Sequence, residues 1–215
     1  MTQIVTHSIF EGFAPSDFDV FTIPGLEPRM DALISSVRPK LNQLGERLAP
    51  ALSVLCGEEM FAHVAKHARR TVNPPDDTWV AFAPNKRGYK AHPHFQIGLF
   101  STHLFIQFAI IYESTSKSAF ADEALGHLES IIAQIPAGYV WSGDHTVPGG
   151  TAHGSLGRDA LAALLSRLRS VKASEILCGI HIDRSNPLLL DGEALIARAE
   201  ETFETLLPLY RMARK

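Results

Sequence analysis

Apolar residues in the first third of the chain recur at the three- and four-residue spacing of an amphipathic helix. From Leu26 to about Leu55 the repeating positions are Met30, Leu33, Ile34, Val37, Leu41, Leu44 and Leu48. We predict one long helix here. Pro39 and Pro50 are expected to kink or divide it, because proline donates no backbone hydrogen bond. A short helix over Ser16–Phe21 is predicted to precede it.

A further helix is predicted over Glu58–Arg70. Two acidic residues lie in its first turn and basic residues in its last, which matches the helix dipole at both ends. Residues three and four positions apart share one face of a helix. We therefore expect one face to present His63, Lys66, His67 and Arg70, with the helix ending before Asn73, Pro74 and Pro75.

The middle of the chain changes to short segments rich in aromatic and β-branched residues, which is typical of strands. The predicted strands are Thr78–Ala83, Phe95–Phe100 and Leu104–Glu113. Only three residues separate the second from the third, so we expect an antiparallel hairpin. Both alternating sets of the third strand are largely apolar, which places it in the centre of a sheet covered on both sides.

Helices and strands alternate in the last half of the chain. We predict helices over Ser118–Ile135, Arg158–Val171 and Asp191–Arg211, the last capped by Asp191, strands over Tyr139–Ser142 and Glu175–Asp183, and a glycine-rich loop over Gly143–Gly157. No repeat or long linker interrupts the pattern. The prediction is a single α+β domain over residues 1–215, with a mainly antiparallel β-sheet packed against amphipathic helices.

The composition of the chain indicates its structural class and the compartment in which we expect it to work. The chain is 46% hydrophobic and 20% charged, which is ordinary for a globular domain. Its two cysteines, Cys56 and Cys178, are far apart and are expected to be reduced. The N-terminus lacks the pattern of a secretory signal, and the longest apolar run, Leu104–Tyr112, is too short to cross a membrane. We expect a cytoplasmic protein with no membrane partner.

Charge is segregated along the chain. The net charge is −3, yet the segment from His63 to Leu99 contains six Lys or Arg against Asp76 and Asp77. Its local net charge is therefore +4, which leaves the rest of the chain at −7. Segregated charge steers an anionic ligand toward one place.

The leading functional hypothesis is a basic surface that binds an anionic small molecule, phosphorylated or nucleotide-like. Arginine grips a phosphate or a carboxylate with two parallel hydrogen bonds. The predicted ligand-binding residues come from the helix end, from the turn NKRGYK between two strands and from the strand that follows: His63, Lys66, His67, Arg69, Arg70, Lys86, Arg87, Tyr89, Lys90 and His94. The alternative for such a run of charges is a solvated surface.

Two other functions use the same region. A module for RNA or single-stranded DNA would use the cations with Tyr89 as a stacking platform. A hydrolase-like or metal-dependent enzyme would need His63, His67, His94 and Asp183 to converge on one pocket. The HxxxH spacing suits a zinc ion, but Lys66 and Arg70 on the same face would repel a dication, so we expect no metal and no cofactor. His181 and Asp183, alternating on one strand, could form a histidine–carboxylate pair.

Long and unusual strings in the chain resemble a known family. They are SDFDVFTIPGLEPRM, RPKLNQLGERLAP, HVAKHARRTVNPPDDTWVAF, NKRGYK, PHFQIGL and FAIIYES. On these strings the chain resembles the YktB-like family of uncharacterised bacterial proteins, closely over the first 115 residues. The resemblance implies a compact cytoplasmic α+β domain with a sheet flanked by helices and no established activity.

Overall fold

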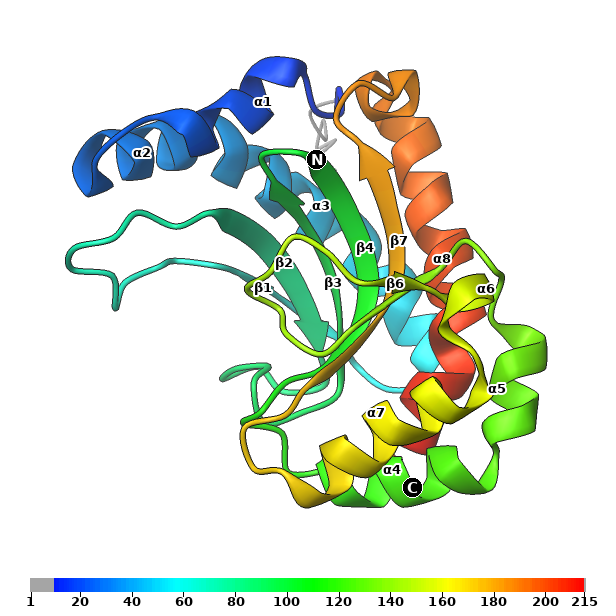
Figure 1. Cartoon of the computed structure of the whole chain (residues 1–215). Coiled ribbons are helices and arrows are strands. Elements are labelled where there is room, and N and C mark those ends of the chain that lie inside the picture. The colour runs from blue at the N-terminus through cyan, green and yellow to red at the C-terminus, as the bar shows by residue number, and fades with distance from the viewer. Residues whose placement is uncertain (1–9, 215) are drawn as a thin grey trace.

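The computed structural model describes residues 10–214 (Figure 1). Residues 1–9 and residue 215 lie outside the described residues. The predicted absence of a secretory signal concerns mainly residues 1–9, and the predicted domain 1–215 includes both of these ends. Within residues 10–214, no helix combines the length and the apolar composition needed to cross a membrane.

A seven-stranded sheet organises the chain, and its strands lie in the order β1-β2-β3-β4-β7-β5-β6. Every neighbouring pair is antiparallel. The strands are β1 (Phe61–Val64), β2 (Asp77–Ala83), β3 (His94–Phe100), β4 (His103–Ile110), β5 (Val140–Ser142), β6 (Thr151–Ala152) and β7 (Ile176–Asp183). The predicted hairpin is confirmed as β3–β4, and β4 occupies the predicted central position.

Helices pack on one face of this sheet. The α-helices are α1 (Pro15–Asp19), α2 (Leu26–Ala32), α3 (Arg38–Cys56), α4 (Lys117–Gly126), α5 (Leu128–Gln134), α6 (His153–Leu156), α7 (Arg158–Ser170) and α8 (Gly192–Met212). Figure 1 shows α3 and α8 crossing behind the strands. Phe203 and Tyr210 of α8 pack on the ring of Phe95 in β3, with centroids 4.8 and 5.2 Å away. The predicted α+β fold, a mainly antiparallel sheet against amphipathic helices, is confirmed.

Alternation along the strands gives the sheet two chemically different faces. Alternate strand residues such as Phe82, Ile97 and Ile106 belong to the apolar core under the helices. The opposite face, which we call the polar face, contains Gln96 hydrogen-bonded to Gln107 on the neighbouring strand. The loop between β5 and β6, residues 143–150, runs across this face (Figure 1).

The prediction of a helix over Glu58–Arg70 is wrong. Helix α3 ends at Cys56, where Gly57 adopts a left-handed conformation with φ 74°. Phe61–Val64 then forms β1, whose backbone groups pair with β2 in place of a helical turn. Residues 65–70 form a loop. The expected helix face of two histidines and two cations therefore does not exist, although Lys66, His67 and Arg70 of the loop line one cavity.

Smaller differences concern how the predicted helices and the predicted loop are divided. The long N-terminal helix is divided by a π-helical turn at Leu33–Val37 directly before Pro39, as predicted for that proline, whereas Pro50 lies inside α3 without dividing it. The helix predicted over Ser118–Ile135 is split into α4 and α5. The predicted loop 143–157 contains β6 and α6. Asp191 caps α8 as predicted, because its Oδ1 accepts the N–H of Ala194 at 3.0 Å.

The sheet requires glycine at position 179, where β7 passes between β4 and β5. A Cβ there would lie 2.0 Å from the carbonyl oxygen of Ile106. We expect Gly179→Ala to lower the free energy of unfolding by about 1–3 kcal/mol, the usual range for overpacking. Denaturant unfolding measures this loss.

The matched control is Gly126→Ala in α4, where an added Cβ meets nothing within 4 Å, so stability should hold or rise. Equal effects of the two variants would contradict the close packing of β7 on β4.

Candidate functional site

Trp79, on the polar face of β2, lies where three segments meet. Its Nε1 donates a hydrogen bond to the hydroxyl of Tyr89 at 3.1 Å. The ring of His67 meets it edge-on with a centroid distance of 5.6 Å, and the ring of His145 does so at 6.3 Å. The indole therefore joins the β1–β2 loop, the β2–β3 loop and the β5–β6 loop.

A cavity of about 480 Å³ opens beside this indole. It is lined by Val64 at the end of β1 and residues 65–70 of the β1–β2 loop, together with Trp79, Tyr89 and Lys90. Lys90 is paired with Glu113 at 3.0 Å. Among residues 10–214, no carboxylate lies within 4.0 Å of the charged nitrogens of Lys66, Arg69 or Arg70. The cavity thus has several cations on its walls whose charge is not neutralised by a close acidic partner.

The β1–β2 loop turns sharply enough to gather these cations. His67 adopts a φ of 52°, the left-handed region that non-glycine residues seldom occupy. The turn closes with a hydrogen bond from the N–H of Arg70 to the carbonyl of His67 at 3.0 Å. Nε2 of His67 lies 3.2 Å from Oγ1 of Thr78. Burial, together with the charges of Arg70 and Arg38, lowers the pKa of His67 to about 4, so this imidazole is neutral.

The structure brings some of the predicted ligand-binding residues together and leaves others apart. Those that line the cavity are Lys66, His67, Arg69, Arg70, Tyr89 and Lys90. Lys86 and Arg87 are exposed in the β2–β3 loop and do not line it. Nε2 of His63 lies 2.9 Å from the carbonyl oxygen of Asn85, so this ring fastens β1 to the β2–β3 loop.

His94 is fully buried and has a structural part on the polar face. Burial lowers its pKa to about 4, so the ring is neutral. Its Nδ1 donates to the carbonyl of His92 at 2.8 Å, and its Nε2 accepts from the side-chain amide of Gln96 at 2.9 Å. Gln96 in turn accepts from Gln107 at 2.9 Å. Both ring nitrogens are used, so His94 has no nitrogen left for a ligand.

The predicted cluster of His63, His67, His94 and Asp183 does not form. Asp183 pairs with His103 at one end of β4, whereas His94 pairs with Ala109 near the other end. The predicted pair of His181 and Asp183 is also wrong. His181 stacks on His103 with a centroid distance of 4.1 Å, and Oδ1 of Asp183 accepts from the backbone and side chain of Ser185. The turn after β7 satisfies this carboxylate locally.

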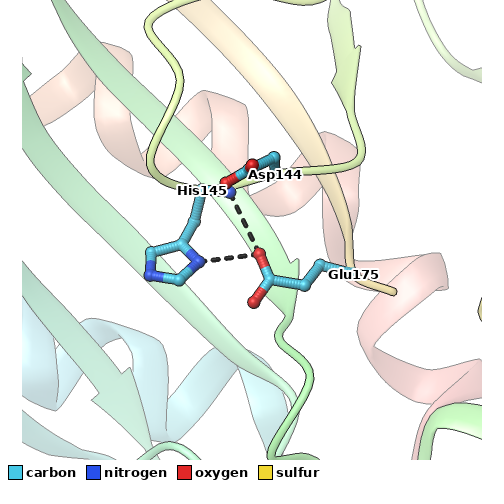
Figure 2. Close-up of side chains that lie close together, drawn as sticks. All are labelled: Asp144, His145 and Glu175. Carbon is cyan, nitrogen blue, oxygen red and sulfur yellow. Dashed lines mark hydrogen bonds and ion pairs between the residues drawn. The ribbon is translucent and has the colours of Figure 1, made fainter. Parts of the chain in front are cut away.

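A histidine–carboxylate pair exists elsewhere, between His145 and Glu175 (Figure 2). Nδ1 of His145 donates to Oε2 of Glu175 at 2.7 Å, and the backbone N–H of His145 reaches the same oxygen at 3.0 Å. The other oxygen of Glu175 accepts the N–H of Tyr112 at 3.2 Å. Figure 2 shows the second ring nitrogen of His145, Nε2, on the side away from Glu175. Within the described residues it has no hydrogen-bond partner.

The electrostatics shift the pKa of each member of this pair toward its charged form. Burial alone would lower the pKa of His145, but the hydrogen bond and the charge of Glu175, helped by Asp77 and Asp144, raise it above its ordinary value. Burial would raise the pKa of Glu175, and the contacts with His145 lower it below its ordinary value. Each partner therefore favours the charged form of the other.

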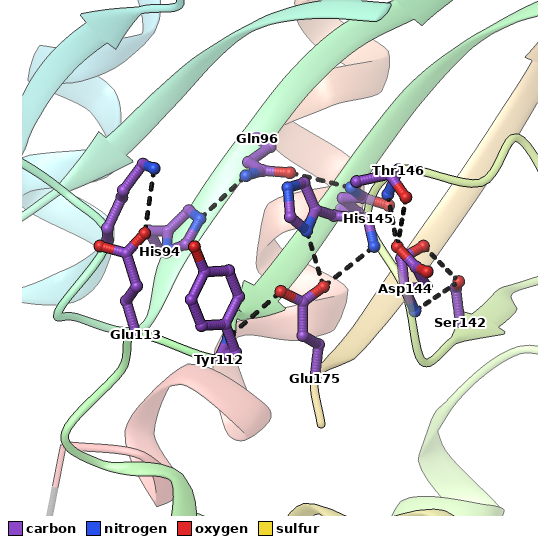
Figure 3. A network of polar contacts seen from close by, with 11 residues as sticks. His94, Gln96, Tyr112, Glu113, Ser142, Asp144, His145, Thr146 and Glu175 are labelled. Atoms are coloured by element: carbon purple, nitrogen blue, oxygen red, sulfur yellow. Dashed lines mark hydrogen bonds and ion pairs between the residues drawn. The ribbon is translucent and has the colours of Figure 1, made fainter. Parts of the chain in front are cut away.

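Asp144 lies next to this pair but belongs to a separate turn (Figure 3). Its Oδ1 accepts from the N–H and the hydroxyl of Thr146 at 2.8 and 2.7 Å. The potential metal-ligating atoms of Asp144, His145 and Glu175 all lie within 4.8 Å of one another. The ion pair already uses the nitrogen and oxygen that would face a shared ion. We therefore interpret this cluster as a hydrogen-bonded network.

Asp77 is the second unusual acid of the polar face. It is only 6% exposed, and no other described residue donates a hydrogen bond to its carboxyl group. Burial raises its pKa to about 6, and the nearby charges of His145 and Arg70 limit that rise. The charges of His145 and Arg70 thus both favour the ionised form of Asp77.

Comparison with known proteins assigns the chain to a family. Residues 13–210 match the family described as "Domain of unknown function (DUF1054)". The chain belongs to this family. A UPF0637 protein of Bacillus velezensis is 50% identical over 203 residues, covering 94% of this chain and 97% of that protein. UPF0637 proteins of Bacillus licheniformis and Bacillus mycoides are 50% and 49% identical, again over 94% of this chain. The resemblance to an uncharacterised bacterial family is confirmed.

In this DUF1054 member, the sequence did not predict the most distinctive charged groups, which are His145, Glu175 and Asp77. His145 and Glu175 are 30 positions apart, and no local pattern links them. The one signal was the long glycine-rich loop that contains His145, since long loops inside compact domains are often functional. Asp77 looked like one of two acids in a basic segment, and only its burial distinguishes it.

The ion pair leads to a testable prediction about the pKa of His145. Glu175→Gln removes the negative charge that offsets the burial of His145. We expect the pKa of His145 to fall from above its ordinary value of about 6.5 to below that value. An NMR pH titration of the ring Cε1 proton measures it.

The matched control is Glu113→Gln, which neutralises the partner of Lys90. This variant should leave the pKa of His145 unchanged. If Glu175→Gln also left it unchanged, the ion pair would be absent in solution.

Proposed function

We propose that this protein binds an anionic small molecule, phosphorylated or nucleotide-like, in the cavity beside Trp79. The observation that supports this most is the set of cations on its walls, Lys66, Arg69 and Arg70, which have no carboxylate within 4.0 Å among the described residues. An anion would supply the missing countercharge. Such a contact gains strength where the cavity partly excludes water.

The shape and chemistry of the cavity suit a ligand with two parts. Two neighbouring arginines can hold phosphate oxygens through parallel hydrogen bonds. The indole of Trp79 forms an aromatic wall on which a planar group can pack. A nucleotide combines a phosphate with a planar base, and a volume of about 480 Å³ lies within the range of small-molecule sites.

Nucleic-acid binding stays the alternative, but the position of Tyr89 favours it less. The hydroxyl of Tyr89 is bonded to Trp79, and its ring packs against His63 and His94 with centroid distances of 5.9 and 4.9 Å. A ring held in this way is less accessible for stacking with successive bases. The chain also has a net charge of −3, which does not favour a long polyanion.

We further propose that the protein works in the cytoplasm as one domain over residues 1–215. Support comes from the two cysteines, Cys56 and Cys178, which are both free thiols. The family match over residues 13–210 spans most of the proposed domain. The partner is the anionic molecule, with no membrane involved.

The binding proposal is tested by calorimetry with nucleoside mono- and diphosphates, sugar phosphates and inorganic phosphate. We expect at least one compound to bind, and Arg70→Ala to weaken its binding about tenfold or more, since a charge-assisted hydrogen bond contributes about 1.5–3 kcal/mol.

The matched control is Arg87→Ala, which removes the same charge from the β2–β3 loop outside the cavity and should change affinity by less than about twofold. No binding by any compound, or equal losses in the two variants, would overturn the proposal. Retention of mixed oligonucleotides at low salt with no small-molecule binding would favour the nucleic-acid alternative.

A further inference from the structure

We propose that two copies of this protein associate through the free edge of the sheet, where β1 of one copy pairs antiparallel with β1 of the other. The interaction surface is the outer side of β1, and the partner is a second copy of this chain. The two sheets then continue into one across a two-fold axis. The inference does not rest on the proposed function, because no ligand takes part in it.

The backbone of β1 has unused hydrogen-bonding groups on its outer side. Among the described strands, β1 has only β2 as a neighbour. The N–H of Ala65, directly after β1, donates to the carbonyl of Trp79 at 2.9 Å and continues the register of the two strands. Hydrogen-bonded residues alternate along an antiparallel pair, so His63 also directs its backbone groups toward β2. Ala62 and Val64 therefore direct theirs outward, and no described residue outside the sheet hydrogen-bonds to them.

The edge of β1 lacks the usual protection against pairing. Proteins commonly protect an exposed strand edge with a charged residue, a proline or a very short strand. The residues of β1, Phe61–Val64, include neither a charge nor a proline. Ala62 is exposed, and a hollow of about 360 Å³ lies between β1 and α3. The opposite edge of the sheet, β6, has only two residues. Of the two edges, β1 is thus the one that can accept a further strand.

One register between two copies uses only the outward groups. His63 then lies opposite His63 of the partner subunit, and Ala62 lies opposite Val64 of the partner subunit. Each outward N–H of one copy meets an outward carbonyl of the other. Burial lowers the pKa of His63, which favours the uncharged ring and limits repulsion at the axis.

The neighbouring registers need backbone groups that already have partners. A shift in one direction requires the N–H of Met60, which donates to Oγ of Ser53 at 2.9 Å. A shift in the other direction requires the carbonyl of Lys66, which accepts from Arg38 at 3.4 Å. The central register is therefore the one that breaks no existing hydrogen bond.

The charges at the two ends of β1 favour a second copy as the partner. Glu59 precedes the strand, Lys66 follows it, and both are exposed. Among the described residues, neither has an oppositely charged group within 4.0 Å, whereas Glu58 is paired with Arg214. In the central register, Glu59 lies opposite residue 67 of the partner subunit, next to Lys66 of the partner subunit. The two-fold axis repeats this attraction at the other end, whereas a parallel arrangement would bring like charges together.

One residue belongs to both the proposed interface and the cavity beside Trp79. Lys66 lines that cavity, and so do Arg69 and Arg70 further along the β1–β2 loop. The interface uses neither arginine. The cavity therefore keeps these two cations in the associated form, and the two proposals are tested separately.

Sedimentation velocity over a series of protein concentrations tests the association. We expect the wild type to change from monomer to dimer as the concentration rises. Glu59→Lys and Lys66→Glu should each raise the dissociation constant about tenfold or more, because each replaces attraction by repulsion at both ends of the interface. An equal mixture of the two variants should associate as the wild type does, because every facing charge pair is then attractive.

The mixture distinguishes an interface from an effect within one chain. About 20 Å of extended chain separates Glu59 from Lys66 in the same molecule, which exceeds the distance over which salt screens exposed charges. The matched controls are Glu204→Lys in α8 and Lys172→Glu after α7, which make the same charge changes at exposed positions away from β1. Both should leave the dissociation constant unchanged.

A proline variant tests the backbone pairing. Ala62→Pro removes an outward N–H that the sheet does not use, and proline is tolerated at such an edge position. We expect this variant to stay monomeric at every concentration. Thermal unfolding shows whether it is folded, and the charge reversals decide the question if it is not.

The proposal is overturned if the wild type remains a monomer up to its solubility limit. It is also overturned if a wild-type dimer withstands both charge reversals, if the mixture of the two variants fails to associate, or if folded Ala62→Pro still forms the dimer. The last three results would place the contact between copies on another surface.

Discussion

The contact on which the polar face depends is the buried carboxylate of Glu175. Its two oxygens accept hydrogen bonds from Tyr112 in the turn after β4 and from His145 in the β5–β6 loop. One side chain thereby connects the central strand to a loop that has little apolar surface of its own. Burying a carboxylate is costly unless it is paired and hydrogen-bonded, and three donors meet that requirement here. The loop lies over the sheet because this anion holds it there.

The two faces of the sheet differ in whether they contain buried polar side chains. On the helix side, alternate strand residues form a continuous apolar core. On the other side, Gln96, Gln107 and His94 satisfy one another in a chain of hydrogen bonds, and the neutral state of His94 makes that chain self-consistent. A fully satisfied network of this kind is rigid. It provides a firm base for Trp79 and for the groups that surround it.

Much of this fold was predictable because local pattern determined it. The two apolar faces of β4 indicated a central strand, and Asp191 marked the start of α8. The segment Glu58–Arg70 was misassigned because its helical spacing and its charged ends agreed with a helix, whereas pairing with β2 is a non-local contact that no spacing reveals. Glu175 and His145 meet for the same kind of reason. The cations of the basic segment were identified, and their convergence on one cavity depends on the unusual φ of His67.

The chain has two tryptophans, and their surroundings differ. Trp141 is 2% exposed and its Nε1 is bonded to His153, and it does not line the cavity. Trp79 is half-buried at the cavity, between the rings of His67 and His145. A change in tryptophan emission caused by a ligand in this cavity would therefore come from Trp79. The protein contains its own optical probe of whether the cavity is filled.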